Sequence, residues 1–330
     1  MQNLSIAPLL AIFAIFFPTI LLGQACCSGG VPVSSNLGLP VGAANTVQWS
    51  LSYDYNALNT LKTGSITQQS QERERSTQSV LLELGYSLNN RFSIDGFFAY
   101  LQQDRFIRQS DDLTRTRGIG DAVLLFKYNV FAKDFSSLTL GVGPKIPLGA
   151  TDHLSNNSPI PPALDLQSGS GAWDLLFWTQ WSTSLSFRPS MSWISTAIYS
   201  YRGVYDEYQC QNGSCQTYQF GQDVQLMSGL SDRIFLNNSI FDASLLFRYR
   251  FVTEDLFNDA PRPGTGGNFL LISTGISYWI TSDFSLNATF ELPLYSNVKD
   301  TQVAPTFRLN FGVFHRLELG KNQANSVIKI

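Results

Sequence analysis

The residue types best suited to catalysis are scarce in this chain. Its 330 residues include only two histidines, His153 and His315. A hydrolase built into a membrane would need a serine and a histidine close together near the outer rim, with a third group to orient the histidine. His153 has no identifiable partners, and His315 follows a strand predicted to end at the opposite rim. We therefore expect neither an enzyme nor a bound cofactor.

The four cysteines form two pairs in the sequence. Cys210 and Cys215 flank a polar tetrapeptide, a spacing that predicts a local disulfide formed in an oxidising compartment. Cys26 and Cys27 are adjacent, and three interpretations are open: a lipid-modified Cys26, a thiolate metal site, or disulfide partners. Residues 23–25 lack the aliphatic residue expected before a lipidated cysteine, and no further metal ligands are found nearby. A structural role is therefore favoured over metal binding.

Charged side chains that could act on a solute fall on one face of the predicted strands. They make up 14% of the residues, compared with about a quarter in soluble proteins. Alternate residues of a strand face opposite sides, and an arginine or lysine facing lipid near the bilayer centre would cost roughly 2–4 kcal/mol. We therefore predict a wet interior, in which these residues either brace a narrow pore by pairing or select solutes. The predicted lumen-lining residues are Glu83, Asp95, Lys127, Arg248, Arg250, Glu291 and Arg308.

The elements that would position these charges are strands with one apolar row. The clearest runs from Phe241 to Phe251, where apolar side chains alternate with Asp242, Ser244, Arg248 and other residues. Period-two spacing of this kind, bounded by turn residues, is typical of a half-buried strand. The predicted strands cover about 47–55, 80–88, 92–100, 122–130, 138–142, 172–183, 190–202, 220–230, 241–251, 268–279, 286–292 and 307–313.

The connections between these strands alternate between short turns and long polar loops. The long ones cover about 57–76, 102–117, 148–170, 203–219, 253–266 and 296–303. Bacterial outer-membrane barrels have short periplasmic turns, long extracellular loops and an even number of strands. The sequence therefore predicts an all-β fold, a single antiparallel transmembrane β-barrel over residues 46–318. About 12 strands are expected, with 14 as the alternative.

The two ends of the chain differ from the barrel. Leu9 to Leu22 is almost entirely apolar but is shorter than the about 20 residues of a membrane-spanning helix, so residues 1–25 are predicted to be a signal peptide. Residues 26–45 are rich in small residues and aperiodic, and we expect this irregular segment to enter the lumen as a partial plug. Residues 319–330 are expected to form a free C-terminal tail.

Several short motifs resemble those of a known family. They are GIGD at 118–121, GVGPKIPLGATD at 141–152, SGSGAWDLL at 168–176, GGNFLLISTGISYWI at 266–280 and FELPLY at 290–295. In this order they resemble bacterial outer-membrane transporters associated with the meta-pathway of phenol degradation. The positions that match the family's glycine-based patterns include Lys145, Pro147, Gly149, Gly169, Ser170, Gly171 and Asp174. The chain departs from the family at its CCSGG segment and at its tail.

The resemblance implies a barrel distantly similar to long-chain fatty-acid transporters that passes hydrophobic or aromatic small molecules. We therefore expect a passive channel in the bacterial outer membrane, in contact with the lipid bilayer and lipopolysaccharide. Two alternatives are a non-transporting surface barrel that presents its loops to partners, and metal handling through Cys26 and Cys27. The net charge of −3 provides no basic patch, so no nucleic-acid partner is expected.

Overall fold

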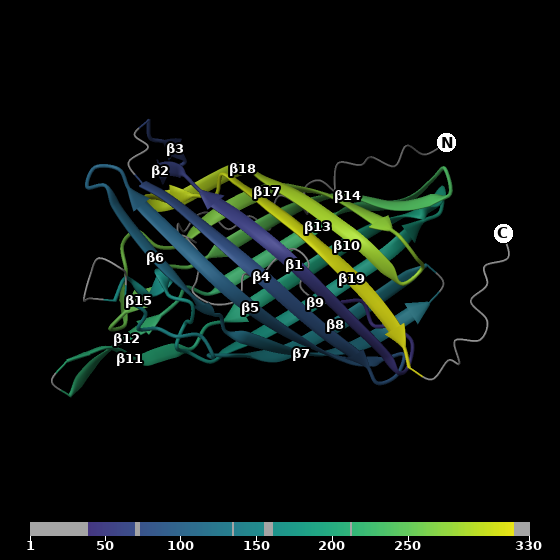
Figure 1. The fold of residues 1–330 in the computed structure, drawn as a ribbon, viewed down its shortest axis with the longest axis horizontal. Helices are drawn as coiled ribbons and strands as arrows, with labels where there is room; N and C mark the ends of the chain where they lie inside the picture. The colour runs from purple at the N-terminus through teal and green to yellow at the C-terminus, as the bar shows by residue number, and fades with distance from the viewer. Residues whose placement is uncertain (1–38, 70–72, 134, 155–160, 212, 320–330) are drawn as a thin grey trace, which may run out of the picture.

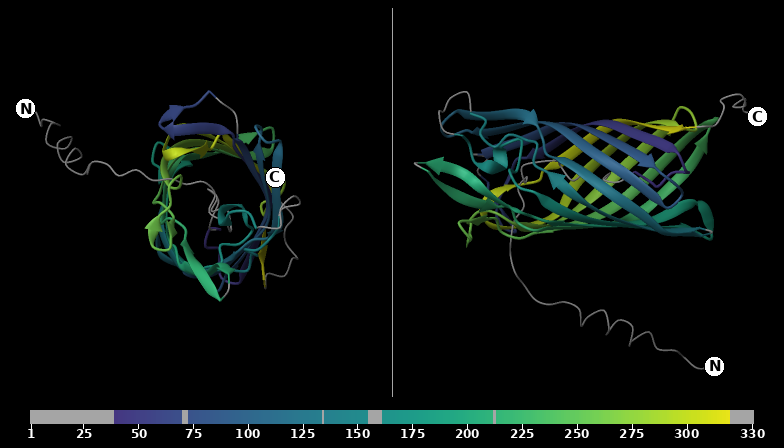
Figure 2. Two further views of the ribbon diagram at one scale, coloured as in Figure 1. Left: turned by 90° about the vertical axis from the view of Figure 1, so that its left-hand side faces the viewer. Right: turned by 90° about the horizontal axis from the view of Figure 1, so that it is seen from below.

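The computed structural model describes residues 39–69, 73–133, 135–154, 161–211 and 213–319. In this part of the chain, twelve antiparallel strands close into a barrel whose strands are inclined to the long axis (Figures 1 and 2). The barrel strands are β1 (Thr46–Leu58), β4 (Arg73–Ser87), β5 (Phe92–Ile107), β7 (Ala122–Lys133), β8 (Ser136–Ile146), β9 (Asp174–Leu185), β10 (Arg188–Tyr201), β13 (Asp223–Leu236), β14 (Ser239–Val252), β17 (Gly267–Trp279), β18 (Phe284–Ala304) and β19 (Phe307–Glu318). The predicted all-β barrel of 12 strands is confirmed, and the alternative of 14 is wrong.

The first and last strands close the ring. Each barrel strand pairs with its sequence neighbour in the barrel, and β1 pairs with β19 from Thr46 opposite Glu318 to Ala57 opposite Phe307. A closed ring leaves no sheet edge, so the backbone N–H and C=O groups of every strand have partners without water. This property allows strands to cross the apolar layer of a membrane.

The barrel is apolar outside and polar inside. Leu51, Phe98 and Phe247 are between 43% and 46% exposed, whereas Glu83 and Lys127 on the inner face are 6% and 2% exposed. A water-soluble protein would show the reverse distribution, because burial of apolar surface drives its folding. The apolar rows identified in the sequence therefore face outward and the charged rows face inward, as a lipid-embedded barrel requires.

Most of the segments predicted as long loops contain strands. They lie at one end of the barrel, which we call the loop end, and the opposite end is the turn end (Figure 1). The loop-end strands are β2 (Thr60–Gly64), β3 (Ile66–Thr67), β6 (Asp112–Ile119), β11 (Val204–Gln211), β12 (Ser214–Gln219), β15 (Leu256–Phe257) and β16 (Ala260–Pro261). The sequence did not indicate them because these strands are short and lack the long alternating apolar row of a strand that meets lipid. A single 3-10 turn, η1 (Leu164–Leu166), also lies at this end.

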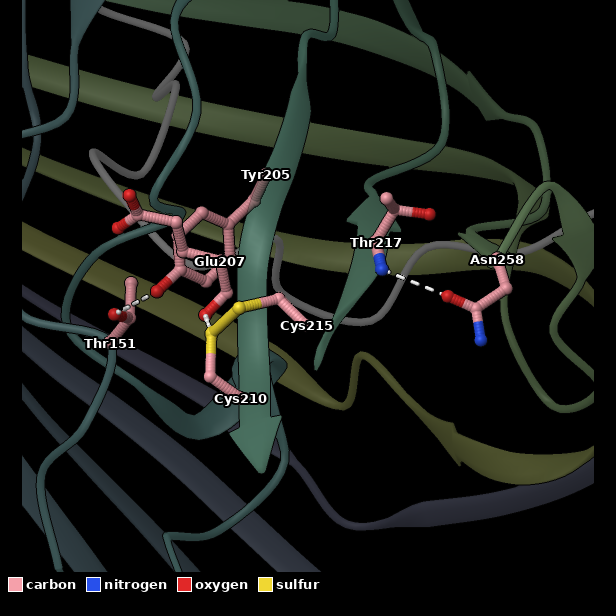
Figure 3. Close-up of a disulfide and its surroundings, with 7 residues drawn as sticks. All are labelled: Thr151, Tyr205, Glu207, Cys210, Cys215, Thr217 and Asn258. Atoms are coloured by element: carbon pink, nitrogen blue, oxygen red, sulfur yellow. Dashed lines mark hydrogen bonds between the residues drawn. A yellow bond between two sulfur atoms is a disulfide. The ribbon is translucent and has the colours of Figure 1, made fainter. Parts of the chain in front are cut away.

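Strands β11 and β12 form a ribbon that extends beyond the barrel rim (Figures 1 and 2). Cys210 and Cys215 are joined by a disulfide near the tip of this ribbon (Figure 3). The base of the ribbon is tied down by a hydrogen bond between the Tyr205 and Thr151 hydroxyls at 3.0 Å. The Thr217 amide donates to the Asn258 side chain at 2.9 Å, which links β12 to the turn between β15 and β16.

The predicted signal peptide, Cys26 and Cys27, and all but the first residue of the predicted tail lie outside the described residues. Within the described ranges, no helix has the length and apolarity needed to cross a membrane.

Candidate functional site

A chain of alternating acidic and basic side chains joins six neighbouring strands at the loop end. Its members are Asp121, Lys145, Asp174, Arg202, Asp223 and Arg250, which we call the acid–base belt. Going along the belt, the successive nitrogen–oxygen distances are 3.0, 2.8, 2.7, 3.6 and 2.6 Å. The first five side chains are at most 4% exposed, so the pairing compensates for the loss of hydration of each charge.

The order of the belt follows from the hairpin connections. Acidic members stand at or just before the first residue of β7, β9 and β13, and basic members stand within two residues of the last residue of β8, β10 and β14. Because successive barrel strands run antiparallel, the start of one strand lies beside the end of the next. Lys145 is directly opposite Asp174 in the β8–β9 ladder, so the two charges meet.

The belt holds a loop that folds into the bore. This inward loop comprises residues 148–154 and 161–170. Both Ser170 and Gly149 donate backbone N–H groups to the Asp121 carboxylate at 3.1 Å, and the Ser170 hydroxyl donates to it at 2.6 Å. A Cβ added to Gly169 would lie 2.1 Å from the Gly149 carbonyl oxygen, so the two backbones can approach only as glycines. The family-like motifs therefore meet in one structural unit.

The inward loop also contacts β5 and β4, which follow β7 in the ring. Leu164 and Leu166 in η1 are 0% and 1% exposed. Arg75 on β4 forms an ion pair with Asp165 at 2.6 Å and donates to Gln103 on β5 at 2.8 Å. The Gln103 amide in turn donates to the Gln167 carbonyl at 2.7 Å. The loop is therefore packed inside the barrel and narrows its mouth. The sequence had predicted an external loop at this position.

The middle of the bore has two unlike walls. The apolar wall is formed by inward-facing residues of β5, β7, β9 and β10: Phe97, Ala99, Leu101, Val123, Leu125, Leu176, Trp178 and Ile198. All are at most 6% exposed. On β14, β18, β19 and β1, across the ring in strand order, lies the charged wall of Arg248, Glu291, Arg308 and Asp54. Arg248 pairs with Glu291, and Arg308 pairs with Asp54 at 2.8 Å.

The seven residues predicted to line the lumen fall into three groups. Arg248, Glu291 and Arg308 form the charged wall, and Arg250 belongs to the belt, where it pairs with Asp223. Glu83, Asp95 and Lys127 come together near the turn end, with the Lys127 ammonium bonded to Asp95 at 2.5 Å. All seven side chains therefore point inward. Each of them forms an ion pair with a side chain of opposite charge or a hydrogen bond with a backbone group.

The turn-end group binds the start of the described chain. The Leu39 amide donates to Glu83 at 2.9 Å and to Asp95 at 3.2 Å, and the Leu39 carbonyl accepts from Lys127. Leu39 is only 7% exposed, so it lies against the inner wall. We call this arrangement the Leu39 clamp. The hydrogen bonds of the clamp reach only the backbone atoms of Leu39. Residues 26–38 of the predicted plug lie outside the described residues.

The two histidines lie in separate surroundings and are not close to each other's partners. His315 packs between the Trp49 and Phe284 rings, each 5.8 Å away, and His153 is held through its backbone by Gln167. No group of three histidine, cysteine or acidic residues with metal-binding geometry occurs in the part of the chain that the structure describes. The candidate metal ligands Cys26 and Cys27 fall outside that part.

Comparisons with known proteins place the fold in one class. No family model matches the sequence, and no curated protein matches it. Among solved structures, an outer-membrane channel from Pseudomonas putida is similar with a TM-score of 0.65 and 13% identity, covering 87% of this chain and 100% of that one. The β-domain of the Bordetella autotransporter BrkA is similar with a TM-score of 0.50 and 11% identity, covering 83% and 100%. The chain thus has the fold of an outer-membrane β-barrel.

Proposed function

We propose that the protein is a channel of the bacterial outer membrane through which small solutes diffuse down their gradients. The observation that carries the proposal is the distribution of side chains: the apolar rows face outward, as contact with lipid requires, and paired charges face inward. The fold shared with the Pseudomonas channel supports the proposal. Lipopolysaccharide would then surround the loop end in the outer leaflet.

The solutes that fit best are small molecules with apolar or aromatic bodies. A bore that passed only hydrated ions would have no need for an inner apolar wall, yet Phe97, Leu125 and Trp178 all point inward. An apolar wall lowers the cost of dehydrating an aromatic or aliphatic body, while the charged wall opposite keeps polar groups solvated. The resemblance to transporters associated with phenol degradation supports the same class of solute.

The inward loop would set the size limit at the loop end. It joins β9 through the belt and reaches β4 and β5 through Arg75 and Gln103, so it covers part of the mouth. The lumen-lining role of Glu83, Asp95, Lys127, Arg248, Arg250, Glu291 and Arg308 belongs to this proposal. The Leu39 clamp supports the further proposal that residues 26–45 narrow the bore at the turn end.

Conductance in planar bilayers tests the proposal. The folded protein should produce current steps above background, and liposomes containing it should take up benzenesulfonate, an aromatic anion that protein-free liposomes exclude, faster than glucose. A correctly folded barrel that gives no current and no solute uptake would contradict transport. That result would favour the alternative of a surface barrel, for which the projecting sheet of β11, β12, β15 and β16 is the supporting observation.

A further inference from the structure

A cavity of about 320 Å³ lies among the loop-end strands β11, β15 and β16. Its lining includes Tyr208 from β11, Phe257 from β15, and Pro261, Arg262 and Pro263 that follow the β15–β16 hairpin. A volume of this size is at the lower end of the range of small-molecule pockets. Rings and prolines make up most of the lining, so the cavity offers flat apolar faces and one cation.

The aromatic part of the cavity is rigid. The Tyr208 ring meets Phe257 edge-on with centroids 6.1 Å apart, and it meets Tyr218 with centroids 5.3 Å apart. Tyr218 is 1% exposed and packs with Leu164 of η1 and Phe220. Edge-to-face arrangements of this kind are favourable beyond their area of contact. The Tyr208 and Phe257 faces therefore keep their positions without a ligand.

The cation of the cavity is also held in place. The Arg262 amide donates to the Asp255 carbonyl at 2.8 Å, and the Arg262 carbonyl accepts from Thr265 at 2.7 Å. Its guanidinium lies 5.3 Å from the centre of the Tyr218 ring. The backbone on both sides of Arg262 is thus fixed, and its side chain stays at the cavity wall.

Arg262 differs from Arg75 and Arg115, two other arginines of the loop end, in its partners. Arg75 and Arg115 pair with Asp165 and Asp104 at 2.6 and 2.7 Å. For Arg262, no carboxylate lies within ion-pair distance among the residues that the structure describes. The carboxylate of Asp255 is engaged elsewhere, by the Tyr218 hydroxyl at 2.6 Å and the Gly221 amide at 2.8 Å. The guanidinium is held by the Tyr208 and Tyr218 side chains but has no carboxylate partner among the described residues, so it can donate to an external anion.

We propose that this cavity is an external binding site for a single aromatic ring that carries a carboxylate. The guanidinium of Arg262 would bind the carboxylate through two parallel hydrogen bonds, a geometry suited to arginine. The faces of Tyr208 and Phe257 and the two prolines would pack on the ring. The lining residues belong to no barrel strand, so ligand binding can be measured whether or not the barrel conducts.

Isothermal titration of the intact, detergent-solubilised protein with benzoate tests the proposal. The wild type should bind benzoate saturably, and it should bind benzyl alcohol and glucuronate at least tenfold more weakly. Arg262→Gln should weaken benzoate binding about tenfold, which corresponds to about 1.4 kcal/mol. Arg262→Lys keeps the charge without the planar fork and should weaken binding less. Phe257→Leu should weaken it about threefold.

Arg115→Gln is the matched control, because Arg115 is another loop-end arginine but already has the Asp104 carboxylate as partner. It should bind benzoate as the wild type does. The heat-dependent gel mobility of folded barrels establishes that each variant is folded, and Arg262→Lys serves if Arg262→Gln does not fold. The proposal is overturned by absence of saturable benzoate binding, by equal binding in folded Arg262 variants, or by a preference for glucuronate. Normal conductance together with any of these results leaves the channel proposal standing.

Discussion

The two ends of the bore each hold a segment of chain against the inner wall, but by different means. At the loop end, Asp121 binds the backbone and side chain of the inward loop, and Gly149 and Gly169 pack without any space for a side chain. At the turn end, Lys127 and Asp95 form a buried ion pair, and together with Glu83 they bind the segment only through the amide and carbonyl of Leu39.

The two kinds of attachment indicate which segment is a permanent part of the folded barrel. The loop end combines buried ion pairs with backbone contacts that tolerate only glycine, so the inward loop and the barrel wall are expected to unfold together. The turn-end segment is held by a few hydrogen bonds, those of the Leu39 clamp and those from the Gly42 and Ala44 amides to Ser87 and Asn90, and each contributes about 1–3 kcal/mol net. The turn-end segment is therefore expected to detach while the barrel remains folded.

The strongest test of this contrast is Asp174→Asn in the belt. Asp174 pairs with both Lys145 and Arg202, and all three side chains are at most 4% exposed. Removing the shared carboxylate leaves two cations without that partner in a dry site, and the expected loss is about 4 kcal/mol of the free energy of unfolding. Urea unfolding in detergent measures it. Arg115→Gln, which breaks an exposed pair, should lose less than about 1 kcal/mol.

Gly169→Ala should have the next largest effect. The added Cβ would lie 2.1 Å from the Gly149 carbonyl oxygen, so either the inward loop moves or the barrel is strained, at a cost of about 3 kcal/mol. Conductance should also rise as the loop leaves the mouth. Gly120→Ala is the control, because its Cβ would meet only side-chain atoms, at 3.2 Å or more. Equal stability of the two variants would contradict the tight packing inferred here.

The loop-end ribbon should respond to pH through Asp255. Burial raises the pKa of Asp255 to about 6 from 3.8. A raised pKa means that the folded state binds the proton more tightly, so stability is greatest below about pH 4 and decreases as pH rises through 6. Docking of the ribbon should weaken by up to about 3 kcal/mol between these limits. Hydrogen exchange of the β12 amides measures this change, and Asp255→Asn should abolish the pH dependence.

The smallest effect is expected at the Leu39 clamp. Glu83→Gln keeps an acceptor for the Leu39 amide but removes its charge, which should cost about 1 kcal/mol locally. Exchange of the Leu39 amide should accelerate about fivefold, while the urea midpoint of the barrel stays nearly unchanged. A large decrease in the midpoint would show that this segment, like the inward loop, is part of the cooperative fold.

The sequence predicted the barrel strands well and the loop end poorly. In β14 and β4, apolar residues alternate with polar ones because one face meets lipid, and this alternation marks each strand without knowledge of its partners. Strands such as β6 and β11 are short and have no long alternating apolar row, so their pairing cannot be recognised from the spacing of apolar residues. The inward direction of residues 161–170 likewise has no periodic signal.

The belt and the apolar wall depend on which strands become neighbours. Asp121, Lys145 and Asp174 were noted only as members of short glycine motifs, and their contact follows from the register of β7, β8 and β9. The inward-facing Leu125 and Trp178 lie in alternating rows that also contain polar residues, so the sequence did not mark them as part of an apolar surface. A search for opposite charges at the ends of successive predicted strands would have suggested the belt.

The pairing of β1 with β19 has a consequence for how the molecule is made. Thr46 can find Glu318 only after nearly the whole chain has been synthesised and exported, so ring closure must be a late event. Until then the backbone N–H and C=O groups along the edges of β1 and β19 lack partners. They can pair with other chains, which promotes aggregation during transit across the periplasm. The chain is therefore expected to depend on holding chaperones and an insertion machinery until its last strand arrives.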